Sequence, residues 1–362
     1  MTSMKVRVIV DRENASWILG KMGERLVREL AVRGADVSLA HEPLDGADIN
    51  HWMSYANVTG RVGRASTMAI THIDDPYKTA HLTALLRERF DLGICMSRDM
   101  MQALIGWGVP AEGLWYVLPA LDAPPEPARI RIAIATRLYP DGRKRESLLE
   151  RLADEIDLSP FHFEIAGSGW DAVVPRLRDA GASVSWDPGG ADYQADYEKI
   201  LQSMRTCGHY LYLGMDEGSL GTLDAVALGL RTIVTPQGFH LEIPGGIDEP
   251  VRTYDDLRGA FTRLATARNA RVEGIRSWSW SELANDHLRI WSILLESGRR
   301  SIAAKLDGSG RYAQSTQPAA GLSERTWSGY YRHALSPSRM LEGLLRTRMM
   351  RPVRRLLRRL RA

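Results

Sequence analysis

The segment from Arg205 to Ile243 reads RTCGHYLYLGMDEGSLGTLDAVALGLRTIVTPQGFHLEI. Its pattern predicts a strand over His209–Leu213, a glycine-containing turn, a helix over Leu220–Leu228 and a second strand over Thr232–Thr235. A strand, a helix and a further strand in this order form a βαβ unit, the building block of parallel sheets. The segment therefore predicts an α/β fold.

The turn before the predicted helix is its distinctive feature. Gly218, Ser219 and Gly221 lie at the start of this helix, where the first N–H groups have no partner within the helix. Such a terminus attracts anions, and phosphates above all. One terminus contributes up to about 2 kcal/mol in a sheltered geometry, whereas a micromolar to millimolar ligand needs about 4–8 kcal/mol. We therefore expect cationic side chains from elsewhere to complete the site.

Alternating strands and helices are predicted on both sides of this segment. The expected helices span residues 23–33, 77–89, 98–107, 146–156, 171–180, 193–204 and most of 278–297. Short strands separate them, and the proline-rich stretch DAPPEPAR, Asp122–Arg129, interrupts the pattern. Two successive α/β halves predict two Rossmann-like domains, residues 1–125 and 126–297, with parallel sheets facing a cleft.

Composition is typical of a soluble globular protein. The 362 residues are 44% hydrophobic and 25% charged, and no apolar run approaches the length of a membrane span. The start MTSMKVRVIV lacks the layout of a secretion signal. Cys95 and Cys207 have no metal-ligand spacing around them, so we expect free thiols in a reducing cytoplasm.

The C-terminal end carries a concentrated positive charge. From residue 339 there are nine Arg and one Glu, so the rest of the chain has a net charge of −5 although the whole has +3. Apolar residues recur every three or four positions in 339–362, which predicts a basic amphipathic helical tail after a flexible linker, 298–338. Binding to an anionic membrane surface is the favoured interpretation. The arginines expected to bind that surface are Arg351, Arg354, Arg355, Arg358 and Arg359.

Two other interpretations of the tail remain open. It could dock on the acidic body of the protein itself, because the two have opposite charge. Binding to nucleic acid is a third interpretation, and it is disfavoured because the basic residues lie outside the folded domains.

Cations that could complete the anion site follow the first strand of the second domain. The segment ATRLYPDGRKRESLL places Arg137 and Lys144 at the carboxyl end of that strand. In a parallel sheet this end lies at the same edge as the turn at Gly218. Two charge-assisted hydrogen bonds, each contributing about 1.5–3 kcal/mol, would bring the site into the required range.

With these residues the chain resembles the retaining glycosyltransferases of family 4, which have the GT-B architecture of two Rossmann-like domains. Arg137-Leu138 with Lys144 looks like the family segment that holds the donor diphosphate, although the loop here is longer. Glu217 to Gly229 resembles the later segment with two acidic positions, and Ser97 to Asp122 resembles the segment that closes the first domain. The likeness extends over about Met4 to Leu295.

The resemblance implies roles for the donor-site residues. Arg137 and Lys144 would stabilise the leaving phosphate, and Asp224 would bind the ribose diol. Glu217 would touch the donor sugar, but only Asp216 keeps the family's spacing of seven residues before Asp224, so either could take this role. The further residues expected to bind the donor nucleotide and its diphosphate are Ser219, Leu220, Gly221, Thr222 and Gly167.

On the acceptor side the resemblance is thinner. Gly20 and Gly23, in ILGKMGERL, would serve where the family has a glycine pair, and His72, in THIDDP, would lie near the reacting sugar. Asp74 and Asp75 also permit a metal-dependent interpretation, because carboxylates can hold a divalent ion on phosphates. The resemblance implies that no metal is used.

The resulting expectation is a retaining, metal-independent transferase. It would move a sugar from a nucleotide-sugar to a saccharide acceptor, with a lipid-linked saccharide as one form, in cell-surface polysaccharide synthesis. No cofactor is expected, since the nucleotide-sugar is a substrate. The protein would be cytoplasmic, with peripheral association with the inner face of the membrane through its tail. The alternatives are a catalytically silent scaffold, a sugar-nucleotide epimerase or a glycosyl phosphorylase on the same fold.

Overall fold

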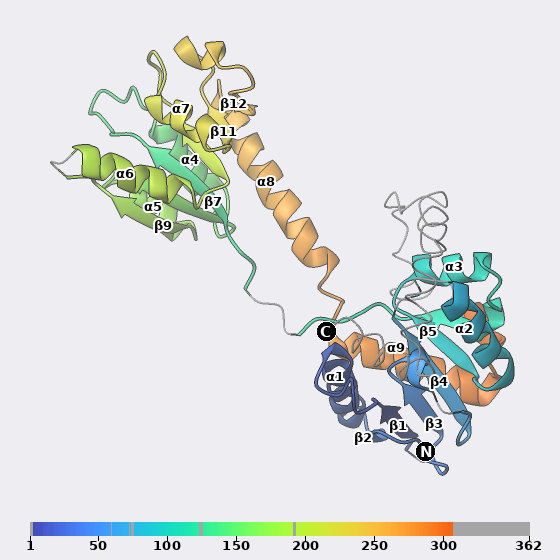
Figure 1. Ribbon diagram of the computed structural model, residues 1–362. Coiled ribbons are helices and arrows are strands. Elements are labelled where there is room, and N and C mark those ends of the chain that lie inside the picture. The colour runs from blue at the N-terminus through green and yellow to red at the C-terminus, as the bar shows by residue number, and fades with distance from the viewer. Residues whose placement is uncertain are drawn as a thin grey trace, which may run out of the picture. The chain divides into compact units, whose positions relative to one another are not determined.

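The chain folds into two compact α/β units, each built on a six-stranded parallel sheet (Figure 1). A computed structural model describes residues 3–58, 60–71, 73, 76–122, 126–190 and 193–306. The first unit contains the described residues up to 122 and those from 277 onward, and the second contains the described residues between them. The predicted α/β class with two Rossmann-like sheets is confirmed.

The first sheet has the strand order β2-β1-β3-β4-β5-β6. Its strands are β1 (Lys5–Ile9), β2 (Asp36–Ala40), β3 (Ile49–Trp52), β4 (Ala65–Ile70), β5 (Leu92–Cys95) and β6 (Leu114–Tyr116). β3, β4 and β5 are buried along their whole length, as expected for central strands of a parallel sheet covered on both faces. Ile9 pairs with both Ala40 and Trp52, so β1, β2 and β3 end at the same level.

The helices of the first unit come from both ends of the chain. They are α1 (Ile18–Val32), α2 (Pro76–Glu88), α3 (Arg98–Gly106), α9 (Trp280–Ser297) and α10 (Ser301–Leu306), with 3-10 turns at Tyr55–Asn57 and Ala111–Gly113. Ser97 caps α3 by accepting a hydrogen bond from the amide of Met100 over 3.1 Å. α1 begins five residues earlier than expected, which places Gly20 and Gly23 inside the helix.

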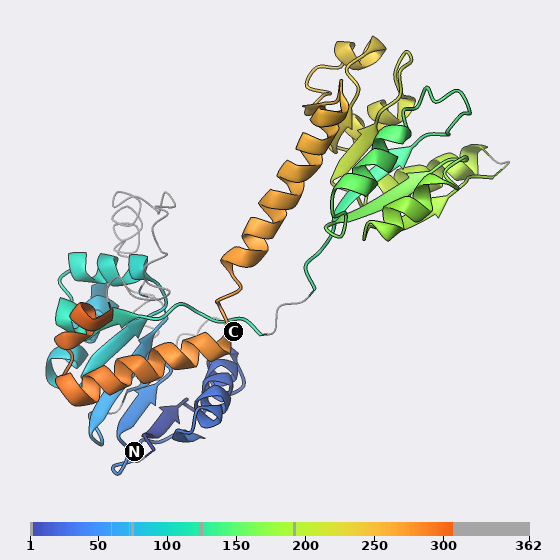
Figure 2. The same cartoon turned by 180° about the vertical axis from the view of Figure 1, so that it is seen from behind.

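The boundary predicted at residue 297 is wrong, because α9 belongs to the first unit. Its side chains Leu283, Ile290 and Trp291 are buried in the core of the first sheet. The helix also lies beside α1 (Figures 1 and 2), where the guanidinium of Arg33 donates to Asn285 Oδ1 over 2.6 Å. An apolar stripe packs where a complementary apolar surface exists, and here that surface lies far upstream in the sequence.

The predicted linker also differs from the structure at its start. Residues 301–306 form α10, and Ile302 and Leu306 are buried in the first core. A helix was not predicted here, because the composition of residues 298–338 favours loop. The rest of the predicted linker and the basic tail, 339–362, lie outside the described residues.

The second sheet has the order β12-β11-β10-β7-β8-β9. Its strands are β7 (Ile130–Ala135), β8 (Phe161–Ala166), β9 (Ser183–Asp187), β10 (His209–Tyr212), β11 (Arg231–Val234) and β12 (Glu249–Pro250). Numbered within the unit, this order is 6-5-4-1-2-3, the arrangement of nucleotide-binding Rossmann domains. The strand order reverses between β7 and β10, which is where ligands bind in such sheets.

Helices complete the second unit. They are α4 (Ser147–Glu155), α5 (Val173–Asp179), α6 (Tyr193–Met204), α7 (Leu220–Ala227) and α8 (Tyr254–Gly274), with a 3-10 turn at Gly238–Glu242. β10, α7 and β11 confirm the predicted βαβ unit to within about one residue at most ends. α8 was not predicted, although Thr253 and Asp256 form a capping box at its start.

No described helix is both long and apolar enough to cross a bilayer. The longest, α8, has 21 residues and is mostly exposed over its last ten. α9, with 18 residues, has one buried face and charged side chains on the other. The arginines predicted to bind a membrane surface lie outside the described residues.

Both cysteines are free thiols, as predicted. Cys95 is fully buried at the end of β5, and burial raises the pKa of its thiol to about 12. Cys207 is half-buried, and burial raises the pKa of its thiol as well. Neither thiol is therefore activated as a nucleophile at neutral pH.

Candidate functional site

The predicted cationic loop and the predicted glycine turn meet at the edge of the second sheet. The loop follows β7 and the turn follows β10, the two strands between which the strand order reverses. The amide of Met215 donates to the carbonyl of Arg143 over 2.8 Å, which joins the two segments directly. This edge is the candidate functional site of the second unit.

Lys144 is the most enclosed cation of this site, with only 12% of its side chain exposed. Its Nζ donates to Asp216 Oδ2 over 2.6 Å and to the hydroxyl of Tyr212 over 2.7 Å. The tyrosine hydroxyl in turn donates to both carboxylate oxygens of Asp216, over 2.6 and 2.8 Å. Burial, then its hydrogen bond with Asp216, raise the pKa of Tyr212, so this hydroxyl remains a donor at neutral pH.

Asp216 accepts hydrogen bonds from every donor of this cluster. The amide of Gly218 adds a hydrogen bond to Oδ1 over 3.1 Å. Burial alone would raise the pKa of Asp216, but the hydrogen bonds from Lys144, Tyr212 and Gly218 outweigh it and lower the pKa. The carboxylate is therefore ionised and holds the position in which a bound anion was predicted.

The amide of Ser219, at the start of α7, is bound by His240, a residue that was not among the predicted site residues. His240 is fully buried, and its Nδ1 lies 3.0 Å from the carbonyl oxygen of Thr235. Because a carbonyl can only accept, Nδ1 carries the proton, and Nε2 accepts from the amide of Ser219 over 2.8 Å. No spacing rule links a residue of the Gly238–Glu242 turn to this helix, so no sequence signal pointed to it.

Two of the four backbone amides of the predicted anion cradle have partners within the protein. The amide of Ser219 is bound to His240, and the amide of Thr222 donates to the carbonyl of Ser219 over 2.9 Å. Leu220 and Gly221 remain, since first-turn amides have no partner within their own helix. Gly221 lies close to β10, because a Cβ there would be 2.5 Å from the hydroxyl of Tyr210.

Three further charged residues were predicted to act at this site, namely Arg137, Glu217 and Asp224. Arg137 and Glu217 are exposed, and neither side chain has a hydrogen bond or ion pair within the described part of the chain. Asp224, on α7, is half-buried and accepts a hydrogen bond from the hydroxyl of Tyr197 over 2.7 Å. The ribose-binding role predicted for Asp224 stays a prediction.

The backbone geometry requires a glycine at position 167, which the sequence pattern did not indicate. Its φ of 128° is open to glycine, and an added Cβ would lie 2.2 Å from the carbonyl oxygen of Thr136. Its amide donates to the carbonyl of Asp187 over 2.9 Å. The residue therefore lets the loops after β7, β8 and β9 cross closely next to the candidate site.

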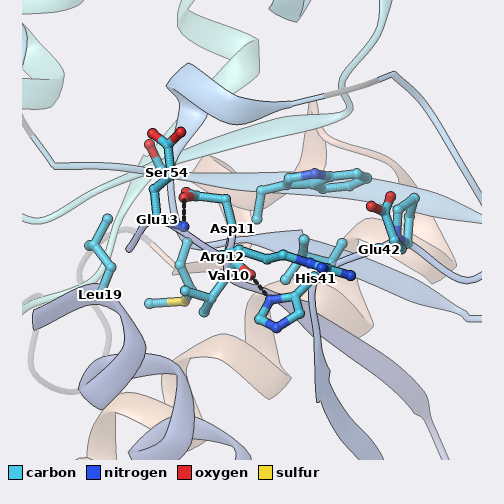
Figure 3. A pocket seen from close by; sticks show the side chains of 12 residues that line it. Val10, Asp11, Arg12, Glu13, Leu19, His41, Glu42 and Ser54 are labelled. Atoms are coloured by element: carbon cyan, nitrogen blue, oxygen red, sulfur yellow. Dashed lines mark hydrogen bonds between the residues drawn. The ribbon is translucent and has the colours of Figure 1, made fainter. Parts of the chain in front are cut away.

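A pocket of 350 Å³ lies at the corresponding edge of the first sheet (Figure 3). We call it the β1–β3 pocket, because all of its residues except Leu19, which lies in α1, follow or end these strands. They are Ile9, Val10, Asp11, Arg12, Glu13, Leu19, His41, Glu42, Pro43, Trp52, Met53 and Ser54. This pocket was not predicted, although Asp11-Arg12-Glu13 begins one residue after β1 and His41-Glu42 directly follows β2, where ligand-binding residues of parallel sheets lie.

Comparison with known proteins gives only distant likenesses. No protein-family model and no curated protein matches the chain. Among solved structures, a glycosyltransferase from Rickettsia africae has a TM-score of 0.34 and 11% identity, covering 82% of this chain and 100% of its own.

Two further solved structures are similar at the same level. The lipopolysaccharide outer core galactosyltransferase WaaB, in its apo form, has a TM-score of 0.33 and 13% identity, covering 79% of this chain and 98% of its own. Anabaena HepE, in complex with UDP and glucose, has a TM-score of 0.29 and 12% identity, covering 80% and 99%.

Gly20 and Gly23 have a packing role in place of the predicted acceptor-side role. Both are buried within α1. A Cβ on Gly20 would lie 1.9 Å from the carbonyl oxygen of Ala15, and one on Gly23 would lie 2.9 Å from the side chain of Val10. The glycines let α1 approach its own preceding loop and β1, so neither offers a surface to a ligand.

His72, with Asp74 and Asp75, lies outside the described residues, so its predicted place near the reacting sugar stays a prediction. Within the described part of the chain, no group of three or more His, Cys, Asp and Glu side chains is arranged to hold a metal ion.

Proposed function

We propose that the protein is a retaining, metal-independent glycosyltransferase that moves a sugar from a nucleotide-sugar to a saccharide acceptor in cell-surface glycan synthesis. One observation carries the proposal. A sheet with the strand order of nucleotide-binding domains brings Lys144 and the start of α7 together where that order reverses. Arg137 and the amides of Leu220 and Gly221 supply further donors at the same edge.

Donor binding requires Lys144 to exchange partners. Its charge is matched by that of Asp216. A diphosphate carries more negative charge than one carboxylate and offers more acceptor oxygens, so it can replace Asp216 at Nζ. The exposed guanidinium of Arg137 would bind the same diphosphate with two parallel hydrogen bonds.

The chemistry follows from this charge arrangement. As the bond between the sugar and the diphosphate breaks, negative charge grows on the leaving phosphate, and Lys144 and Arg137 stabilise it. The acceptor hydroxyl attacks the anomeric carbon from the face that the phosphate leaves, and its proton passes to the phosphate oxygen. Bond formation on that same face retains the anomeric configuration.

The acidic residues would position the donor. Asp224, held by Tyr197, would accept from the ribose diol, and Glu217, which is exposed at the turn, would accept from hydroxyls of the donor sugar. His72 keeps its proposed place near the reacting sugar. These roles follow the resemblance to family 4.

A thermal-shift screen with UDP, GDP, ADP and their sugar derivatives tests the donor site. A ligand at a hundred times its dissociation constant should stabilise the protein by about 2.7 kcal/mol. The shift should disappear in Arg137→Ala and Lys144→Ala but persist in Arg205→Ala, which removes an exposed arginine of the same unit. NMR of the product then decides the configuration, and an inverted anomer would rule out the retaining mechanism.

A catalytically silent scaffold is the second candidate, and two contacts favour it. Lys144 is already paired with Asp216, and the amide of Ser219 is already bound to His240. If no nucleotide shifts the melting temperature even in Asp216→Asn, which frees Lys144, the scaffold becomes the better description.

A further inference from the structure

Arg145, which directly follows Lys144, has a left-handed backbone conformation with a φ of 54°. Every other positive φ in the described part of the chain belongs to a glycine. Residues with a side chain are disfavoured in this conformation, because their Cβ lies too close to the following carbonyl oxygen. A glycine would adopt it without that cost. The arginine therefore points to a side-chain interaction that offsets the strain, and strained residues of this kind gather at functional sites.

The guanidinium of Arg145 makes that interaction. Its Nη2 donates to the carbonyl of Arg252 over 2.9 Å, and its Nη1 lies 3.5 Å from the hydroxyl oxygen of Thr235. Thr235 directly follows β11, and Arg252 lies between β12 and α8. Burial lowers the pKa of the Arg145 guanidinium, but an arginine stays charged in a protein, so these are contacts of a charged donor. They tie the loop after β7 to two segments that are distant in sequence.

The main chain around Arg145 is fixed on both sides. The amide of Arg145 donates to the carbonyl of Gly142 over 2.9 Å, which closes a tight turn. The carbonyl of Arg145 accepts from the amide of Leu148 over 3.0 Å, within the first turn of α4. Residue 145 thus joins the turn to the helix. Its φ sets the direction in which the backbone at Lys144 approaches α4.

That direction places Lys144 inside the candidate site. Only 12% of its side chain is exposed, and its Nζ reaches Asp216 over 2.6 Å and the hydroxyl of Tyr212 over 2.7 Å. A change of Arg145 to a negative φ would rotate the preceding peptide and turn Lys144 away from both partners. The location of this cation therefore depends on the conformation of the next residue.

Thr235 connects the same contact to the start of α7. Its hydroxyl faces the guanidinium of Arg145, and its carbonyl lies 3.0 Å from Nδ1 of His240. His240 in turn accepts from the amide of Ser219 over 2.8 Å. The cationic loop and the start of the helix are thus held by one residue at the end of β11.

We propose that Arg145 is a positioning residue of the donor site. Its contact with the carbonyl of Arg252 holds the left-handed turn that directs Lys144 to the place proposed for the donor diphosphate. Arg145 acts through Lys144 and not by touching the ligand. Its part in donor binding rests on the proposed function, whereas the positioning of Lys144 does not.

The reactivity of Lys144 tests the positioning without any nucleotide. The full chain is treated with a limiting amount of an amine-acylating reagent well below its melting temperature, and mass spectrometry measures the rate at each lysine. An ammonium group held in an ion pair and shielded from solvent reacts slowly, so Lys144 should be protected. Lys199, in the same unit and with 67% of its side chain exposed, serves as the internal reference and should react equally in all variants.

Three substitutions separate the guanidinium from the backbone. Arg145→Gly should raise the labelling rate of Lys144 about tenfold, because a hydrogen bond from a charged donor is lost. Arg145→Ala should raise it further, since it loses the same bond and keeps the left-handed strain. Arg145→Lys retains a charged donor for the carbonyl of Arg252 and should restore most of the protection.

Two further arginines of the second unit provide matched controls. Arg143→Ala removes an exposed side chain of the same loop that contacts Tyr139 and Asp141. Arg151→Ala removes a contact with the ring of Tyr254 and controls for a loss of stability in the same unit. Both should leave the labelling of Lys144 as it is in the natural protein.

Calorimetry with UDP, GDP and ADP extends the test to the donor. Arg145→Gly should weaken the binding of the nucleoside diphosphate about tenfold. The corresponding nucleoside has no phosphate for Lys144 to contact, so its affinity should be the same in both proteins. This difference separates a displaced lysine from general damage to the site.

Unchanged labelling of Lys144 in Arg145→Gly and Arg145→Ala would overturn the proposal. Protection kept in Arg145→Gly alone would also overturn it, because the left-handed backbone would then suffice without the guanidinium. Equal labelling in Arg145→Lys and Arg145→Ala would rule out a role for the charged contact. Increased labelling with unchanged nucleotide affinity would uphold the positioning and remove its part in donor binding. If no nucleotide binds the natural protein, the proposed function fails and the labelling result still decides the positioning.

Discussion

Lys144 and Asp216 form an ion pair, with Nζ and Oδ2 2.6 Å apart, in the place where the sequence predicts that Lys144 holds a phosphate. The carboxylate receives the lysine, a tyrosine hydroxyl and a backbone amide, the set of donors that an anion would use. Asp216 therefore binds Lys144 in the way proposed for the donor diphosphate. A nucleotide bound as proposed would have to replace it.

Asp216→Asn should accordingly tighten the binding of nucleoside diphosphates. The amide keeps the size of the side chain but removes the charge that neutralises Lys144, and we expect an increase in affinity of about tenfold. Calorimetry with each nucleotide measures it. Asp141→Asn, in the same loop and exposed, should have little effect. Unchanged or weaker binding of the nucleoside diphosphate in Asp216→Asn would contradict competition between Asp216 and the diphosphate for Lys144.

His240→Ala should destabilise the second unit by about 1–3 kcal/mol. The change leaves the amide of Ser219 without its acceptor and opens space in a fully buried position. Urea denaturation measures the free energy of unfolding. Leu241→Ala, next in sequence and 63% exposed, provides the control and should be nearly neutral. Equal effects of the two changes would show that the histidine does not organise the turn.

Gly167→Ala should be more damaging than Gly142→Ala. Both residues have positive φ, 128° and 69°, but only Gly167 has a backbone oxygen within 2.2 Å of its added Cβ. The left-handed strain alone costs about 1–2 kcal/mol, and Gly167→Ala must add a backbone shift to it. The melting temperatures of the two variants measure the difference in stability. Similar values would contradict the close approach of the loops at Gly167.

The stability of the first unit should fall in mild acid. Burial lowers the pKa of His287 from 6.5 to about 4, and burial, with the charge of His287, lowers the pKa of His51. The unfolded chain therefore binds more protons than the folded chain between those pH values. The free energy of unfolding should drop as pH falls through this window, by about 3 kcal/mol for His287.

Substitution of His287 tests whether this residue causes the pH dependence of the free energy of unfolding. His287→Gln keeps a hydrogen-bond donor for the carbonyl of Leu283 but cannot titrate, so stability should depend less on pH. His81→Gln changes an exposed histidine and should leave the slope as it was. Denaturation curves at several pH values test both, and an unchanged slope in His287→Gln would refute the assignment.

Removing residues 339–362 should release the protein from anionic vesicles. Each basic residue near an anionic leaflet contributes about 1 kcal/mol, and the segment contains nine arginines. Co-sedimentation with phosphatidylserine vesicles measures the effect, and raising the salt concentration should weaken binding of the intact chain. Unchanged sedimentation after the deletion would place membrane binding elsewhere or exclude it.

The sequence predicted the features that depend on neighbouring residues. The βαβ unit around α7 has strong apolar runs and a glycine turn, and its boundaries were found to within about one residue at most ends. The loop with Arg137 and Lys144 was assigned to the edge at which it lies, because parallel strands share a carboxyl end. Local pattern and sheet geometry were sufficient in both cases.

Features that depend on distant partners were not predictable in this way. Nothing in the pattern of α9 says which of two sheets it covers, and nothing near Ser219 indicates that His240 would accept its amide. α8 lacks a clear apolar period because its last ten residues are mostly exposed. Whether Lys144 pairs with Asp216 or with a bound anion depends on the relative strength of two interactions, and the spacing of residues in the sequence does not indicate it.

The placement of α9 and α10 in the first core makes the order of synthesis matter. The second unit is continuous in the chain, whereas the first needs side chains such as Trp291 and Ile302 that emerge only after the second is complete. At roughly 5–20 residues per second, about 10–35 s separate the two halves of that core on the ribosome. During this delay the apolar side chains of the first core that α9 and α10 cover are without these partners. A fragment ending at residue 125 would lack them permanently.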